Sequence, residues 1–258
     1  MFKKKSLGQH FLKSSSYLRA IADAAEVTAG DTVLEVGPGE GALTAELLSR
    51  GAHVIAIEKD HRLVPMLSVT FDTEIREKKL TLIEGDALEL ELPLSIYKVV
   101  ANIPYYITGA LLRKYLTSPN QPSTLVFLVQ KEVAERIARS KKESLLSLSI
   151  KVYGTPKYVK TVPSGAFSPP PDVDSAILLL SNISRDHFAN TDEERHFFAL
   201  LHAGFAQKRK LLSRNLEPVL GKNAANMLEA VGLPRNSRAE DVSLVHWLAL
   251  AKVAHTEI

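Results

Sequence analysis

The sequence predicts a doubly wound α/β domain with a Rossmann-like, mostly parallel sheet, followed by a small all-helical domain. Short apolar runs recur through the first two thirds of the 258 residues, and uninterrupted apolar strands are typical of parallel sheets covered on both faces. Segments with helical spacing separate these runs, which is the order of βαβ units. From Asp192 onward only helical patterns appear. The composition changes near Ser184–Asn190, so we expect one domain at residues 1–184 and a second at residues 185–258.

Each expected strand is a short run of aliphatic and aromatic residues that ends at turn-forming residues. The runs that would pair in parallel are Thr32–Val36, His53–Ile57, Leu80–Ile83, Tyr97–Ala101 and Thr124–Val129. Two later segments, Ile150–Val162 and Ala176–Leu180, would form an antiparallel pair at the end of the sheet.

Helical spacing predicts helices at Gly41–Arg50 and Ile107–Leu116, between the expected strands. Asp60 is placed to cap the helix after the second strand, and Pro65 should bend that helix or lie in its first turn. In the second domain the helical patterns lie at Phe197–Leu201, Leu211–Leu216, Ala224–Val231 and Leu244–Val253.

The composition excludes several classes of protein. The chain has no cysteine, which excludes disulfides, thiolate metal sites and a cysteine nucleophile, and we expect no bound metal. No apolar run approaches the about 20 residues that span a bilayer, and no apolar stretch follows the basic N-terminus as it would in a secretory signal. We therefore expect a soluble, cytoplasmic protein with no membrane partner. Nothing in the sequence demands more than a monomer.

The charge of the chain is unevenly distributed, although the net charge is only +3. Residues 31–100 carry an excess of acidic side chains, and residues 131–160 carry an excess of basic ones. Further basic clusters lie at Lys3–Lys5 and in the helical domain, at Lys208, Arg209, Lys210 and Arg214. Any one cluster is explained more simply as solvated surface, but together they suggest a polyanionic partner such as RNA. We expect the helical-domain cluster to bind phosphate.

A glycine-rich loop, Glu35–Gly41, follows the first strand and opens a helix. Gly37 and Gly39 would let the backbone approach a ligand closely. Glu58 ends the second strand, where a carboxylate can accept hydrogen bonds from both ribose hydroxyls of an adenosine. The loop alone fits either a dinucleotide such as NAD or S-adenosylmethionine.

Two acidic residues favour S-adenosylmethionine. Glu35 would repel the pyrophosphate of a dinucleotide, whereas the sulfonium and ammonium groups of S-adenosylmethionine are cationic. Asp86, followed by Ala87 after the third strand, can accept a hydrogen bond from an adenine amino group. The simpler explanations are that Glu35 braces the glycine turn and that Asp86 caps a helix or turn.

The segment Asn102-Ile103-Pro104-Tyr105 follows the fourth strand, at the sheet edge where open α/β folds bind ligands. The side-chain oxygen of Asn102 and the carbonyl of Ile103 could accept hydrogen bonds from an adenine N6 amine. Such acceptors stabilise the positive charge that develops as this weak nucleophile attacks a sulfonium methyl. Pro104 would fix the loop, and Tyr105 could stack on a flipped base. Without those roles the segment is a turn.

A second aromatic loop precedes the last expected strand. Phe167 is followed by Ser168 and three prolines, which make a stiff, extended segment. Phe167 could form the other face of a base-binding sandwich, or its ring could simply lie in the core.

In this order, the motifs resemble those of the KsgA (RsmA) family of ribosomal RNA adenine dimethyltransferases over essentially the whole chain. The matching segments begin at Leu7–Leu12 and end with Phe167–Ser175 and Phe205–Leu211. The resemblance implies a class I methyltransferase fold and S-adenosylmethionine as cofactor. The cofactor contacts that it implies are Gln9, His10, Leu12, Gly37, Gly39, Glu58, Asp86, Ala87 and Asn102.

The resemblance also implies the substrate. The family dimethylates N6 of two adjacent adenines in the 3′-terminal hairpin of small-subunit (16S) ribosomal RNA, and we expect this to occur in an assembling small subunit. Asn-Ile-Pro-Tyr also occurs in the related large-subunit enzymes of the macrolide-resistance type, which are the alternative. A dinucleotide oxidoreductase and a non-catalytic RNA-binding factor are further hypotheses.

Overall fold

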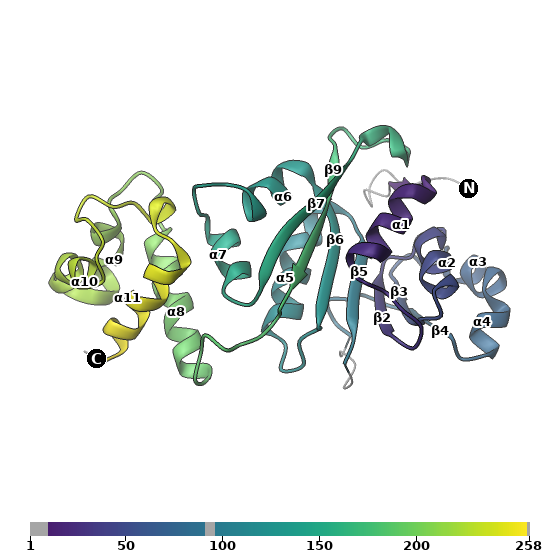
Figure 1. The fold of residues 1–258 in the computed structure, drawn as a ribbon, viewed down its shortest axis with the longest axis horizontal. Coiled ribbons are helices and arrows are strands. Elements are labelled where there is room, and N and C mark those ends of the chain that lie inside the picture. The colour runs from purple at the N-terminus through teal and green to yellow at the C-terminus, as the bar shows by residue number, and fades with distance from the viewer. Residues whose placement is uncertain (1–9, 91–95, 257–258) are drawn as a thin grey trace. The chain divides into compact units, whose positions relative to one another are not determined.

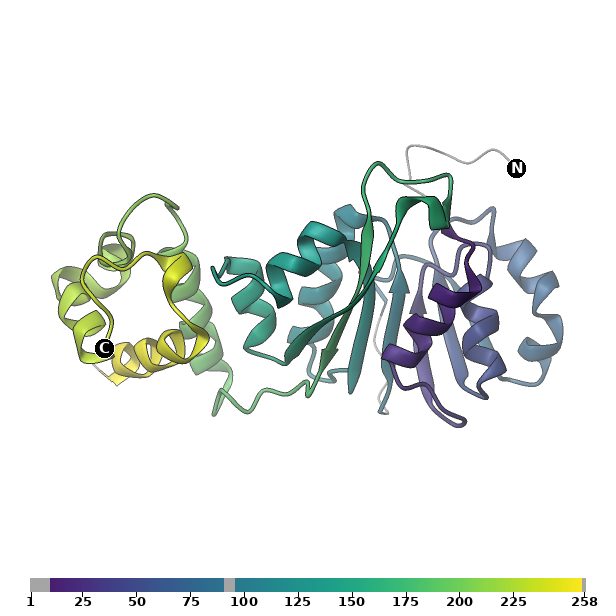
Figure 2. The ribbon, with the colours of Figure 1, turned by 45° about the horizontal axis from the view of Figure 1, so that its top comes forward.

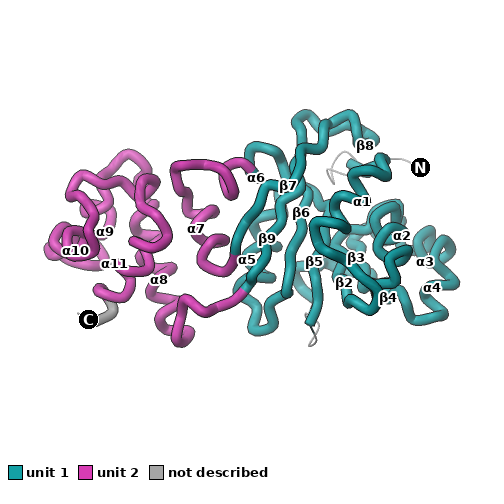
Figure 3. The backbone as a smooth tube through the Cα atoms, in the orientation of Figure 1, with its two compact units in different colours: residues 1–134, 155–183 teal, residues 135–154, 184–258 magenta. Residues whose placement is uncertain are grey.

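The computed structural model describes residues 10–90 and 96–256 (Figure 1). The backbone divides into two compact units (Figure 3). The first comprises residues 1–134 and 155–183, and the second comprises residues 135–154 and 184–258. The sequence predicted one boundary after residue 184. The chain does pass from one unit to the other there, but the second unit also takes in the earlier segment 135–154.

Unit 1 contains a sheet of seven strands among the described residues, in the order β4-β3-β2-β5-β6-β9-β7. The first five strands in this order pair in parallel, while β9 runs antiparallel to both β6 and β7. The predicted mostly parallel sheet with a terminal antiparallel pair is confirmed. The strands are β2 (Thr32–Val36), β3 (His53–Glu58), β4 (Leu80–Glu84), β5 (Lys98–Asn102), β6 (Thr124–Gln130), β7 (Thr155–Val162) and β9 (Ser175–Ser181).

The helices of unit 1 cover this sheet, and α1 lies beside α2 in both views of the ribbon (Figures 1 and 2). Aliphatic side chains of both helices and of β2, β3 and β6 form one buried core. The burial of these apolar side chains is the main stabilising contribution to the fold. The helices are α1 (Ser15–Ala24), α2 (Ala42–Ser49), α3 (Val64–Thr70), α4 (Asp72–Arg76), α5 (Thr108–Thr117) and α6 (Lys131–Ala138), the last of which continues into unit 2.

The connection order creates a crevice at one place in the sheet. The chain runs outward from β2 to β3 and β4, and then returns to form β5 on the other side of β2. Ligands of open α/β sheets bind at such a switch point, beyond the carboxyl ends of the strands. Here these ends are Val36 of β2 and Asn102 of β5.

Two expectations about local structure were wrong. The strand expected at Ile150–Val162 starts only at Thr155, because Ile150 and Lys151 are the last residues of the helix α7 (Leu145–Lys151), which a capping box of Ser144 and Ser147 begins. Asp60 does not cap α3, which begins only at Val64. The Asp60 Oδ1 atom instead accepts hydrogen bonds from the backbone and side chain of Arg62. Pro65 lies in the first turn of α3, which is one of the two alternatives that the sequence predicted for it.

Unit 2 is helical throughout its described part, as the sequence predicted for the C-terminal region. Its interior contains the fully buried Trp247, whose ring stacks on Phe205 at a centroid distance of 5.9 Å. The hydroxyl of Tyr153 donates a hydrogen bond to the buried carboxylate of Glu194. Besides α7, its helices are α8 (Thr191–Gly204), α9 (Leu212–Leu220), α10 (Ala224–Ala230) and α11 (Leu244–Thr256). Across the residues described, none of the helices combines the length and apolar character that crossing a bilayer requires.

Candidate active site

A cavity of about 340 Å³ lies in unit 1 at the carboxyl ends of β2 and β5. It is lined by nearly all of the residues that the sequence singled out for cofactor binding and catalysis. These are His10, Leu12, Gly37, Gly39, Glu58, Asp86, Ala87, Asn102, Ile103, Pro104, Tyr105 and Phe167. Gln9, also predicted to contact the cofactor, lies outside the described residues. Strand order explains why these distant residues meet, since parallel strands end at the same edge of a sheet.

The glycine loop turns sharply at the end of β2. Gly37 has a φ of +72° and Gly39 a φ of +61°, in the left-handed region that favours glycine. A Cβ atom at Gly39 would lie 2.8 Å from the ring of Phe11, so a side chain there would force this ring to move. The loop therefore brings bare backbone to the wall of the cavity.

Glu35 lies just before this loop and is buried, with 1% of its surface exposed. Its Oε2 atom accepts a hydrogen bond of 2.7 Å from the Thr44 hydroxyl. The buried Oε1 atom has no hydrogen-bond partner among the described residues. Burial, reinforced by the nearby Glu58 carboxyl, raises the pKa of Glu35 to about 8. From the sequence, Glu35 was expected to carry a negative charge, but a pKa of about 8 leaves this carboxyl mostly protonated at neutral pH.

Glu58 is also buried, at the end of β3. Its Oε2 accepts a hydrogen bond of 3.0 Å from the backbone N–H of Gly39, and its Oε1 accepts one of 2.8 Å from that of Asp60. Burial raises the pKa of Glu58, and these backbone donors oppose part of the rise. The carboxylate thus ties β3 to the glycine loop. The Lys59 backbone N–H also bonds the carboxylate, whose remaining acceptor capacity faces the cavity that Glu58 lines.

Asp86 follows β4 and is held by two groups. Its Oδ1 accepts a hydrogen bond of 2.9 Å from the backbone N–H of Leu88, which is the turn-forming role considered above. Its Oδ2 pairs with the ammonium of Lys59 at 2.6 Å. This ion pair lowers the pKa of Asp86, so the carboxylate is ionised at neutral pH.

The first described residues pass beside the cavity. The two-residue strands β1 (Phe11–Leu12) and β8 (Phe167–Ser168) pair antiparallel to each other. Just before β1, the Nδ1 atom of His10 lies 2.9 Å from the carbonyl oxygen of Pro169. Because β1 is tied to β8, residues 10–12 and Phe167 form one wall of the cavity.

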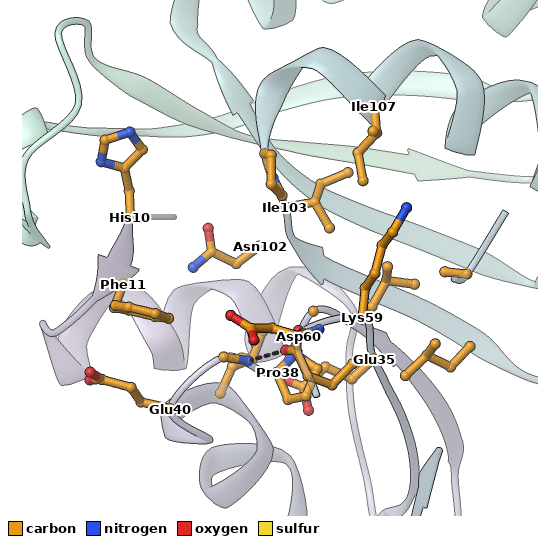
Figure 4. A pocket seen from close by; sticks show the side chains of 18 of the residues that line it. His10, Phe11, Glu35, Pro38, Glu40, Lys59, Asp60, Asn102, Ile103 and Ile107 are labelled. Atoms are coloured by element: carbon orange, nitrogen blue, oxygen red, sulfur yellow. Dashed lines mark hydrogen bonds between the residues drawn. The ribbon is translucent and has the colours of Figure 1, made fainter. Parts of the chain in front are cut away.

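Asn102 is the last residue of β5, and its side-chain amide points into the cavity (Figure 4). Within the part of the chain that the structure describes, no residue hydrogen-bonds this amide. As far as residues 10–90 and 96–256 are concerned, its oxygen and both N–H groups are available to a ligand. Ile103 is buried directly behind it and Pro104 begins the following turn.

The two predicted stacking aromatics occupy different environments. The hydroxyl of Tyr105 forms a hydrogen bond of 2.6 Å with that of Ser175. Burial raises the pKa of Tyr105, and this bond opposes part of the rise. The ring of Phe167 is only 5% exposed and belongs to the core, yet it also lines the cavity. The core position considered for Phe167 is confirmed, and its stacking on a base stays a prediction.

The predicted RNA-binding cluster lies in unit 2, on the turn between α8 and α9. The side chains of Lys208, Arg209 and Lys210 are exposed, and Arg214 lies 3.9 Å from Glu217 on the first turns of α9. The buried amide of Asn215 donates hydrogen bonds to two carbonyl groups of this turn, at Gly204 (2.6 Å) and Gln207 (3.0 Å). The cluster is therefore carried on a turn that is fixed from inside.

Three cavity or cavity-side residues were not singled out from the sequence. Lys59 pairs with Asp86, and Tyr106 lines the cavity with 74% of its surface exposed. Ser175 is fully buried and contacts Tyr105. The signals for Lys59 and Tyr106 were their positions immediately after Glu58 and Tyr105. Ser175 gave no such signal, because the residue it contacts is 70 positions away.

Comparison with known proteins agrees with this geometry. Residues 1–256 match the family described as "Ribosomal RNA adenine dimethylase". The chain is 43% identical to "Ribosomal RNA small subunit methyltransferase A" of Thermosynechococcus vestitus, over 97% of this chain and 96% of that protein. It is 42% identical to the protein of the same name from Dehalococcoides mccartyi (strain CBDB1), over 96% of this chain and 87% of that protein.

Solved structures with the same fold include two enzymes of different origin. A dimethyladenosine transferase from Plasmodium falciparum has a TM-score of 0.83 and 27% identity, covering 96% of this chain and 98% of that one. The 23S rRNA methyltransferase ErmE has a TM-score of 0.78 and 25% identity, covering 95% of this chain and 99% of that one. The small-subunit relatives are thus more similar in sequence than the large-subunit enzyme. With the family matched from end to end and its motifs gathered around one cavity, the chain belongs to the ribosomal RNA adenine dimethylase family.

Proposed function

We propose that this protein transfers methyl groups to N6 of adenines in small-subunit ribosomal RNA, dimethylating two adjacent bases near the 3′ end. The observation that carries the proposal is the amide of Asn102, which has no partner among the described residues and points into the same cavity as the glycine loop and its acidic neighbours. This placement joins a site for a cationic adenosine cofactor to a hydrogen-bond acceptor suited to an adenine amine.

S-adenosylmethionine is the methyl donor of this family, and the cavity fits it. The buried Glu35 Oε1 atom, which lacks a partner among the described residues, would meet the cationic methionyl part. Glu58 would accept hydrogen bonds from the ribose, and Asp86 would accept one from the adenine. His10, Leu12, Gly37, Gly39 and Ala87 would form the remaining walls.

The bound cofactor supplies an electrophilic methyl group, and the chain supplies orientation. Asn102 Oδ1 and the Ile103 carbonyl would accept hydrogen bonds from the target amine, which directs its nitrogen toward the cofactor side of the cavity. As the nitrogen becomes positive, these acceptors stabilise it more strongly than in the ground state. Tyr105 and Phe167 would hold the flipped base, and water can take the proton that leaves the product.

Unit 2 would bind the RNA backbone through Lys208, Arg209, Lys210 and Arg214. All four cations are exposed; the first three lie on a fixed turn and Arg214 lies in the first turn of α9, which suits contact with phosphates. The names of the relatives with about 40% identity support the small-subunit substrate over the large-subunit alternative. We further propose that the protein acts as a cytoplasmic monomer on an assembling small subunit.

The test of this mechanism is methyl transfer by the wild-type protein and by an Asn102→Ala variant. We expect the variant to retain its thermal stability but to lose at least about a hundredfold in rate, as when an oriented hydrogen-bonding group is removed from a transition state. The rate of methyl transfer is measured with labelled S-adenosylmethionine and the RNA hairpin. An Asn102→Ala variant with the rate of the wild type would refute the role of Asn102. NAD binding without S-adenosylmethionine binding would instead support the dinucleotide hypothesis.

A further inference from the structure

We propose that Ser175 is a positioning residue, whose buried hydroxyl sets the direction of the Tyr105 ring and so prepares it to stack on the target base. The observation is the hydrogen bond of 2.6 Å between the Tyr105 and Ser175 hydroxyls. Tyr105 lines the cavity, whereas Ser175 is fully buried behind it. The inference rests on the proposed function, because it concerns the binding of a base beside Asn102.

Ser175 is held at a fixed point of the fold. It begins β9 and is paired on both sides, with Gln130 of β6 and with Val162 of β7. The preceding residue, Asp174, is also tied to two segments. Its side chain accepts a hydrogen bond of 3.0 Å from the Ser164 backbone, and its carbonyl accepts one of 3.0 Å from that of Lys131. A hydroxyl on this frame has little freedom to move.

Tyr105, in contrast, lies in a short turn. It begins a 3₁₀ turn of only three residues, Tyr105–Ile107, and such turns have poorer hydrogen-bond geometry than an α-helix. Backbone bonds from Ile107 N–H to the Pro104 carbonyl (3.2 Å) and from Thr108 N–H to the Tyr105 carbonyl hold the turn, but neither of them fixes the side chain. The hydroxyl at the far end of the side chain is therefore the second fixed point that defines the direction of the ring.

The hydroxyl of the neighbouring Tyr106 has no such anchor among the described residues. Tyr106 belongs to the same turn and lines the same cavity, but 74% of its surface is exposed. A stacking ring must lie in one orientation before the base arrives, since ordering it during binding would reduce the affinity. The Ser175 bond supplies this order to Tyr105 in the free protein.

The experiment compares the wild type with Ser175→Ala, Tyr105→Phe and the double variant. Each single variant is expected to lower kcat/KM for the RNA about three- to tenfold, the effect of losing one neutral hydrogen bond, while the affinity for S-adenosylmethionine stays unchanged. The double variant should be no slower than the slower single variant, because both changes remove the same bond. The matched control is Ser181→Ala at the other end of β9, which should behave as the wild type.

Three results would overturn the inference. These are a Ser175→Ala enzyme with wild-type kcat/KM, losses that multiply in the double variant, and a loss of cofactor affinity equal to the loss of rate. The last result would indicate a general disturbance of unit 1. If the wild type itself transfers no methyl group, the proposed function fails instead.

A second measurement tests the positioning without any activity. Three-bond couplings of labelled tyrosines report whether the Tyr105 side chain keeps one χ1 rotamer, and the Tyr105→Phe spectrum identifies its signals. We expect one rotamer in the wild type and averaging among rotamers in Ser175→Ala. The same single rotamer in both proteins would refute the positioning role.

Discussion

The raised pKa of Glu35 predicts that binding of S-adenosylmethionine depends on pH. In the free protein this buried group has a pKa of about 8, chiefly because burial disfavours its charged form. A cation beside its unpartnered Oε1 atom would favour the carboxylate, so binding should release a proton at neutral pH. For a group of this pKa the ionised fraction rises roughly 25-fold between pH 6 and pH 7.5, and the affinity should rise with it.

Calorimetric titration measures both quantities. Repeating the titration at pH 7 in buffers of different ionisation enthalpy should show close to one proton released for each cofactor bound. Glu35→Gln should bind more weakly and lose most of the pH dependence. An affinity for the wild type that is constant from pH 6 to pH 7.5 would refute the reasoning, as would an unchanged pH dependence in Glu35→Gln.

Three further results are expected. Since the Glu35 pKa is raised from 4.5 to about 8 in the folded state, its contribution to the stability of the free protein should fall as pH rises through this window. The fall is on the order of 3 kcal/mol between pH 4.5 and pH 7, and chemical denaturation of Glu35→Gln should lack it. Neutralising Lys208, Arg209 and Lys210 together should lower the slope of log affinity for RNA against log salt by about 2 to 3. Asn215→Ala should destabilise unit 2 by about 1–3 kcal/mol in thermal unfolding and weaken RNA binding, because two carbonyl groups lose their donor; an unchanged melting temperature would contradict this role.

The sheet was largely predictable because its strands are continuous apolar runs. The strand at Thr32–Val36 was predicted with its observed limits, and the one at His53–Ile57 is longer by a single residue. The helix at Leu145–Lys151 was missed because it begins with a capping box. In this box the side chains of Ser144 and Ser147 each accept a hydrogen bond from the backbone of the other, which apolar spacing does not reveal. The sequence also did not predict that the segment 135–154 belongs to the second unit, since this depends on tertiary packing.

The site shows the same division between local pattern and long-range contact. Gly37, Glu58, Asp86 and Asn102 each end or follow a strand in the sequence. Because parallel strands end at the same edge of a sheet, the sequence predicted that these residues meet, and they line one cavity. The protonation of Glu35 could not be predicted in this way, because it depends on how completely the folded chain excludes water from that carboxyl.

The most direct test of the proposed function uses two RNA substrates. The protein is incubated with labelled S-adenosylmethionine and either small ribosomal subunits that lack the modification or protein-free large-subunit RNA. The RNA is then digested and searched for N6,N6-dimethyladenosine by mass spectrometry. We predict dimethylated adenines from the small subunit alone. Product from large-subunit RNA alone would contradict the proposed substrate and place the activity with enzymes of the macrolide-resistance type.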